Sequence, residues 1–162
     1  MLVALTITAI LLQLSVPPFA RLRARWAVHG ATGQILSGLQ LARRTALTTG
    51  QSVTLCPTGD GSRCSLGSSH WMLFANDPGG SDARREAGEA ILREWRLAAQ
   101  IEVSGTRGYA AYQPETSAAS TLTFTFCHHA HPEARQSLVV SQTGRPRLIR
   151  DPPSSASHPS CP

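Results

Sequence analysis

The sequence predicts an α+β fold in which one long N-terminal helix packs on an antiparallel β-sheet head. Residues 1–20 carry no charged side chain and are mostly apolar, as expected of a hydrophobic helix. Residues 21–50 place apolar side chains at helical spacing, and beyond residue 50 the spacing changes to the alternation typical of strands. A helix and a sheet that each have one apolar face bury both faces by packing together, which gives the α+β arrangement.

The first segment, MLVALTITAILLQLSVPPFA, is long enough to cross a membrane. A helix rises about 1.5 Å per residue, so about 20 apolar residues span a bilayer core of about 30 Å. Two alternatives are a cleaved signal peptide, which would begin with basic residues, and a buried core helix. We expect a membrane helix that kinks or ends at Pro17 and Pro18, because proline lacks an N–H and crowds the preceding turn.

Residues 21–50 are expected to continue this helix as an amphipathic segment. Arg43 and Arg44 should point away from its apolar face, and Gly50 stands where a C-terminal cap is expected. The apolar positions that recur on one helical face are Ile35, Leu39, Ala42 and Ala46, and Leu36 and Leu47 widen that face.

Residues 51–150 are expected to form a β-rich head, followed by a tail over residues 151–162. The clearest strand is 121–127, in which Leu122, Phe124 and Phe126 share one face and threonines the other. The tail is rich in proline and serine, and Cys161 is expected to hold it. The other expected strands are 51–56, 71–74, 90–95, 100–103, 109–112, 137–141 and 147–149.

The charge balance suits an acidic partner. The 162 residues carry a formal net charge of +5, and all 15 basic residues are arginine. The planar guanidinium offers a fork of donors that matches phosphate, whereas lysine is a point charge. Nucleic acid, lipid headgroups and an acidic protein all remain possible partners on this ground.

The four cysteines indicate two disulfides and therefore an oxidising compartment. Cys56 and Cys64 flank PTGDGSR, whose turn residues favour a small stapled hairpin. Cys127 would then pair with Cys161 and hold the C-terminal tail. A zinc site is the alternative, although the spacing contains no C-x-x-C pair.

Taken in series, these segments resemble type IV pilin-like proteins, and within them the FimT/GspH group of minor pilins and pseudopilins. The resemblance covers nearly the whole chain. It is carried by MLVALTITAILLQLSVPPF, by SGLQLARRTALTTGQSVTLCP, by WMLF followed by GEAILREW, and by TLTFTFC followed by SLVVSQTGRPRL.

The resemblance implies a type IV pilin-like fold and a single-pass inner-membrane protein with a periplasmic head, which reaches the pilus or cell surface after assembly. It implies contacts with other pilins through the N-terminal helix. It also places a prepilin peptidase motif immediately before Met1, so we expect an upstream leader and that peptidase as a partner. Arg21, Arg23 and Arg25 follow the apolar run and would by themselves keep the head cytoplasmic, and a basic leader reverses this preference.

The segment Gly144-Arg145-Pro146-Arg147 is the strongest candidate for binding chemistry. Gly144 permits a tight turn between two expected strands, and Pro146 stiffens it. In an extended segment Arg145 and Arg147 point to the same side, about 6.5–7 Å apart, which suits successive phosphates of one strand. FimT-like proteins carry a C-terminal G-R-x-R pattern associated with DNA binding. The resemblance therefore implies DNA-binding roles for Gly144, Arg145, Arg147 and the nearby Arg150, while a solvated basic hairpin is the alternative.

The predicted function is that of a minor type IV pilin that binds extracellular DNA, without base specificity, for uptake in natural transformation. The alternative is a type II secretion pseudopilin, or a minor pilin that primes pilus assembly, without DNA binding. A metal-dependent enzyme would rest only on Cys127-His128-His129-Ala130-His131, where Cys127 is expected in a disulfide. We therefore predict no catalytic residue, no metal and no cofactor.

Overall fold

The computed structural model describes the chain except for residues 1, 116–118, 151–160 and 162, and it describes side chains from residue 19 onward. The described residues form one helix, α1 (Leu2–Thr49), followed by strands. The strands are β1 (Ser52–Pro57), β2 (His70–Asn76), β3 (Ile91–Arg96), β4 (Ile101–Gly105), β5 (Ala110–Tyr112), β6 (Leu122–His128), β7 (His131–Val140) and β8 (Pro146–Arg150).

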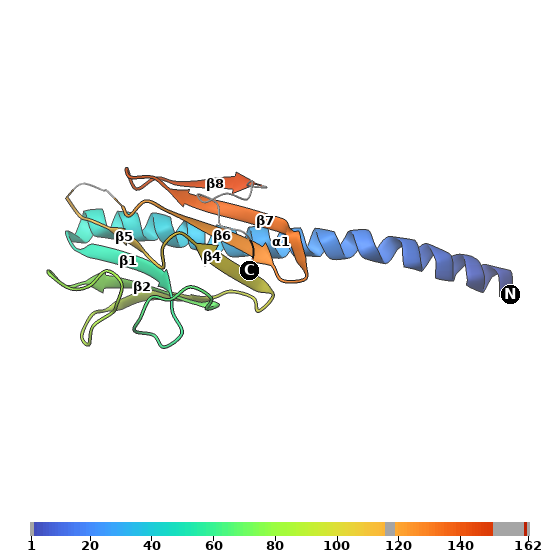
Figure 1. The fold of residues 1–162 in the computed structure, drawn as a ribbon, viewed down its shortest axis with the longest axis horizontal. Helices are drawn as coiled ribbons and strands as arrows, with labels where there is room; N and C mark the ends of the chain where they lie inside the picture. The colour runs from blue at the N-terminus through green and yellow to red at the C-terminus, as the bar shows by residue number, and fades with distance from the viewer. Residues whose placement is uncertain (1, 116–118, 151–160, 162) are drawn as a thin grey trace.

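The strands form two antiparallel sheets that pack on one side of α1 (Figure 1). The first sheet has the order β3-β2-β1-β5 and the second the order β4-β6-β7-β8. The C-terminal part of α1 runs along both sheets, and its N-terminal part extends beyond the head (Figure 1). The predicted α+β class, with a long helix packed on an antiparallel β head, is confirmed.

The apolar face of α1 supplies one side of the core. Ile35, Leu39, Ala42 and Ala46 are all buried, as their spacing predicts. Leu47 does not join them: it is 50% exposed, and the prediction that it widens the buried face is wrong. The reason is its angular position, because Leu47 shares a face with Gln40, Arg43 and Arg44 rather than with the buried stripe.

α1 runs without interruption through Pro17 and Pro18. The expectation that the helix could end at these prolines is therefore wrong. Within the described residues, no helix is apolar over a sufficient length to span a bilayer. The predicted membrane segment, residues 1–20, falls almost wholly on residues 1–18, whose side chains lie outside the described part. The membrane helix therefore stays a prediction.

The two sheets and the helix share one hydrophobic core. Trp71 of β2 is fully buried and meets Phe124 of β6 edge-on, with ring centroids 5.1 Å apart. The opposite face of β6 is also covered, since Thr125 is buried and its hydroxyl lies 2.8 Å from that of Ser137. The threonine face of β6 is therefore buried as well, and its hydroxyls form hydrogen bonds within the protein.

The longest strand differs from its predicted bounds. β7 begins at His131, whereas alternation indicates a strand only from residue 137. Residues 131–136, which include Pro132, also pair with β6, through a bulge between Cys127 and His128. A proline is tolerated beside such an irregularity because its missing N–H breaks no regular ladder there.

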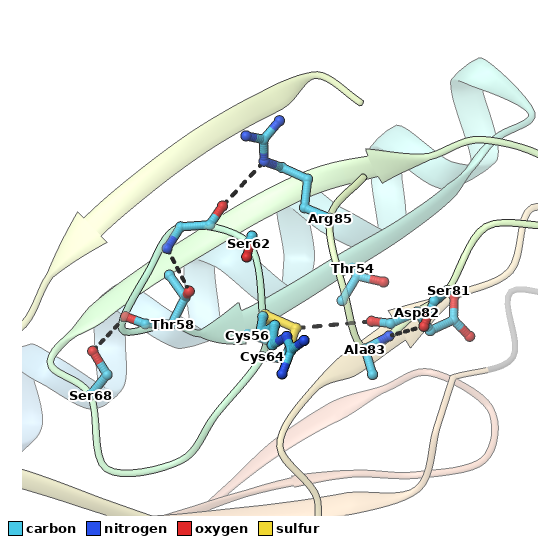
Figure 2. Close-up of a disulfide and its surroundings, with 12 residues drawn as sticks. Thr54, Cys56, Thr58, Ser62, Cys64, Ser68, Ser81, Asp82, Ala83 and Arg85 are labelled. Carbon is cyan, nitrogen blue, oxygen red and sulfur yellow. Dashed lines mark hydrogen bonds between the residues drawn. A yellow bond between two sulfur atoms is a disulfide. The ribbon is translucent and has the colours of Figure 1, made fainter. Parts of the chain in front are cut away.

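Two disulfides are present, and they join the pairs that the sequence predicts. Cys56–Cys64 closes the loop after β1, with an S–S distance of 2.08 Å (Figure 2). Hydrogen bonds around it hold the same loop: Ser68 Oγ donates to the Thr58 carbonyl at 2.5 Å, and Arg85 Nε donates to the Gly61 carbonyl at 3.2 Å (Figure 2). Cys127–Cys161 attaches the C-terminal cysteine to β6, with an S–S distance of 2.00 Å.

Candidate functional site

The basic segment forms the tight turn between β7 and β8. The Gly144 N–H donates to the Ser141 carbonyl at 2.8 Å, and the Ser141 N–H donates to the Arg145 carbonyl at 3.3 Å. Gly144 has φ of 71°, in the left-handed region that a residue with a Cβ rarely adopts. Glycine at this position thus sets the direction in which Arg145 leaves the turn.

The three candidate arginines do not form one cluster. Arg145, Arg147 and Arg150 are all exposed, and none of them forms an ion pair with another described residue. Leu148 packs against the core, so strand alternation places Arg150 on the α1 side of β8 and Arg147 on the opposite side. Arg145 and Arg147 flank Pro146 at the start of β8, the last strand of its sheet.

Arg145 lies in a cleft between the turn and the C-terminal part of α1. The cleft has a volume of about 450 Å³. Because it contains Arg43, Arg44 and Arg145, we call it the arginine cleft. The residues that line it are Gln40, Arg43, Arg44 and Leu47 from α1, and Arg145 and Pro146 from the turn.

Sequence reasoning assigned no role to Arg43 and Arg44. Their spacing with Gln40 and Leu47 shows that these four residues share one helical face, and this was the only sequence feature that groups them. The sequence gives no sign, however, that the β7–β8 turn lies against that face.

Arg150 lies in a different cleft, near the middle of α1. This second cleft has a volume of about 420 Å³ and is lined on the helix side by Arg25, Trp26 and His29, among others. Trp26 is 67% exposed. The structure therefore brings Arg145 together with the end of α1, and it brings Arg150 together with residues far from that end.

The histidine segment at the β6–β7 junction is arranged as hydrogen-bonded surface groups. His129 Nδ1 lies 2.8 Å from a carboxylate oxygen of Glu102, and His131 Nδ1 lies 3.2 Å from one of Glu133. Burial, then the nearby charges of His131 and His129, lower the pKa of His128. Cys127 is committed to its disulfide, and no group of three or more potential metal ligands occurs among the described residues.

One long helix laid across two small antiparallel sheets, with the helix projecting from the head, defines a type IV pilin-like protein. The chain belongs to the GspH family, because the family model described as type II transport protein GspH matches residues 31–144. The matched region contains Arg43 and Arg44 and ends immediately before Arg145. No match is found among curated proteins.

Solved structures share this fold. The minor pilin FimU of Pseudomonas aeruginosa is 18% identical with a TM-score of 0.57, over 76% of this chain and 89% of that one. The minor pseudopilin EpsH from the type 2 secretion system of Vibrio cholerae is 11% identical with a TM-score of 0.53, over 76% of this chain and 96% of that one. GspH of Escherichia coli is 12% identical with a TM-score of 0.55, over 79% of this chain and 91% of that one.

Proposed function

We propose that this chain is a minor pilin whose basic β7–β8 hairpin captures DNA for uptake. The observation that carries the proposal is the exposure of Arg145 and Arg147 around a tight turn, without an ion-pair partner among the described residues. A surface arginine that serves only solubility does not need a glycine and a proline to fix its direction. Exposed guanidinium forks on one turn match the acceptor oxygens of phosphate groups.

The position of the hairpin supports this role. The β7–β8 turn lies at the end of the head remote from the N-terminus (Figure 1). We infer that the N-terminal helix sits in the inner membrane and then packs with other pilins in a fibre, with the head in the periplasm or at the cell surface. The hairpin then points away from the fibre core, toward solution.

Contacts of this kind are made to phosphates, so they confer affinity with little sequence preference. Each neutralised phosphate of duplex DNA contributes about −0.9 to the slope of log K against log salt. A single head with a few such contacts binds weakly, and several heads along a fibre raise the overall affinity through avidity.

A structural pseudopilin is the second candidate function. The observation that favours it is the extent of the family match, which ends at Gly144 and so does not include Arg145 or Arg147. The family consists of structural pilins and pseudopilins, so neither candidate requires a catalytic site. The two functions differ in whether the basic hairpin binds DNA.

The test titrates the full chain, in a mild detergent, into fluorescent duplex DNA at several salt concentrations. We expect salt-sensitive binding that the Arg145→Gln/Arg147→Gln variant weakens, with a slope smaller in magnitude by about 1.8 because two phosphate contacts disappear. The matched control, Arg23→Gln/Arg96→Gln, removes the same charge from exposed positions away from the hairpin. Absence of binding by the folded wild type favours the structural pseudopilin, and equal losses in both variants indicate that only net charge matters.

A further inference from the structure

The arginine cleft concentrates positive charge without a compensating group. Arg43 and Arg44 come from α1 and Arg145 comes from the turn, and no acidic residue lines the cleft. None of the three forms an ion pair within the described part of the chain. Like charges brought together by folding repel one another, so an anion bound between them would relieve the repulsion.

Arg43 is the least satisfied member of this group. Its Nε is buried and has no hydrogen-bond partner among the described residues. A buried donor without an acceptor costs about 1–3 kcal/mol, and more when the group is charged. Tyr112 does not supply the missing negative charge, because burial raises the pKa of its phenol and the opposing influence of Arg43 is smaller.

We propose that the arginine cleft binds one phosphate group of the DNA backbone, and that Arg43 and Arg44 are phosphate-binding residues. Phosphate presents acceptor oxygens in several directions, so guanidinium groups that approach from the helix and from the turn bind it together. Arg147, on the opposite side of β8, is then free to contact a neighbouring phosphate. This inference rests on the proposed function and extends its site from the hairpin onto the helix.

The location of the cleft is compatible with a long polymer as ligand. The C-terminal end of α1 and the β7–β8 turn both lie at the end of the head remote from the N-terminus (Figure 1). The cleft is open to solvent at this end, with Leu47 half exposed at its edge. A DNA strand passing over the turn would therefore meet the helix arginines without a change of fold.

The first experiment measures duplex DNA binding by the full chain in detergent, with Arg43→Gln/Arg44→Gln as the test variant. We expect the slope of log K against log salt to fall in magnitude by about 0.9, for one lost phosphate contact, and affinity near 0.1 M salt to fall roughly tenfold. Arg23→Gln/Arg96→Gln again serves as the charge-matched control and should retain nearly the wild-type slope. Arg44 is exposed, so Arg44→Gln alone gives a smaller loss in the same direction without perturbing the half-buried Arg43.

The second experiment measures the melting temperature of the same proteins in inorganic phosphate and in chloride at equal ionic strength. Phosphate should raise the Tm of the wild type and of the Arg23→Gln/Arg96→Gln control, but not that of Arg43→Gln/Arg44→Gln, because an anion that binds only the folded state stabilises it. This readout does not depend on DNA.

The two experiments separate the inference from the function on which it rests. If Arg145→Gln/Arg147→Gln abolishes DNA binding while Arg43→Gln/Arg44→Gln keeps the wild-type affinity and slope, the inference is overturned and the proposed function stands. If the wild type binds no DNA, the proposed function fails. In that case a phosphate-dependent Tm shift lost with Arg43 and Arg44 still supports an anion-binding cleft, and the absence of a shift overturns it.

Discussion

Asp60 organises the loop that the Cys56–Cys64 disulfide closes. Its carboxylate accepts hydrogen bonds from the backbone N–H groups of Arg63 at 2.8 Å and Ser62 at 2.9 Å. These two hydrogen bonds favour the charged form and hold the pKa of Asp60 well below its usual range, and the bond from Arg63 has the larger effect. The stability that Asp60 contributes is therefore fully present above its unfolded-state pKa of about 3.9 and is lost as pH falls below that value.

Replacing Asp60 by asparagine should make this pH dependence measurable. The Tm difference between wild type and Asp60→Asn is expected to be constant at and above about pH 5 and to shrink as pH falls from about 4 toward 2. Thermal unfolding of both proteins across this range checks it, since taking the difference cancels the other carboxylates. A difference that does not change with pH would show that the Asp60 hydrogen bonds do not depend on its charge.

At the scale of single elements, three glycines of α1 occupy contrasting surroundings. A methyl group added at Gly30 or Gly33 would meet nothing within 4 Å. A methyl group added at Gly38 would lie 3.1 Å from the ring of Trp95 and 3.3 Å from a methyl of Leu55. The close approach of β3 and β1 to the helix therefore depends on glycine at position 38 only.

We expect Gly30→Ala and Gly33→Ala each to raise the free energy of unfolding by about 0.5–1 kcal/mol, because alanine favours the helix. Gly38→Ala should gain less than either, and Gly38→Val should destabilise by about 1–3 kcal/mol through overpacking against Trp95. Denaturant unfolding of the four variants tests the contrast. An equal gain from alanine at all three positions would contradict the packing described for Gly38.

The elements that the sequence predicts correctly are those whose pattern is local. The buried stripe of α1 follows from the spacing of Ile35, Leu39 and Ala42, and β6 follows from the alternation of its aromatic residues. The errors arise where a contact between distant segments decides the outcome. Leu47 is apolar but lies on the face of Gln40, Arg43 and Arg44, which the strands leave half exposed, and the early start of β7 depends on pairing with β6 across a bulge.

The candidate site shows the same limit at the scale of the whole molecule. The turn at Gly144 and the exposure of Arg145 follow from the G-R-P-R segment itself. The meeting of Arg145 with Arg43 and Arg44 does not, because it depends on the strand order β4-β6-β7-β8, which carries the β7–β8 hairpin alongside α1. Alternation identifies strands but does not specify their order in a sheet, so this cleft emerges only from the assembled fold.

The two disulfides constrain the chain over different lengths, and this difference predicts unequal contributions to stability. Cys56–Cys64 has a sequence separation of 8, whereas Cys127–Cys161 has a separation of 34 and encloses β7, the basic hairpin and β8. Closing the longer loop restricts the unfolded chain more, so chain entropy gives about 4 kcal/mol for it against about 2.5 kcal/mol for the shorter loop. The Cys127→Ala/Cys161→Ala variant should therefore unfold at a lower denaturant concentration than Cys56→Ala/Cys64→Ala, with the full chain in detergent at neutral pH. Equal or reversed costs would mean that the packing of Cys56 in its buried cluster, rather than chain entropy, dominates.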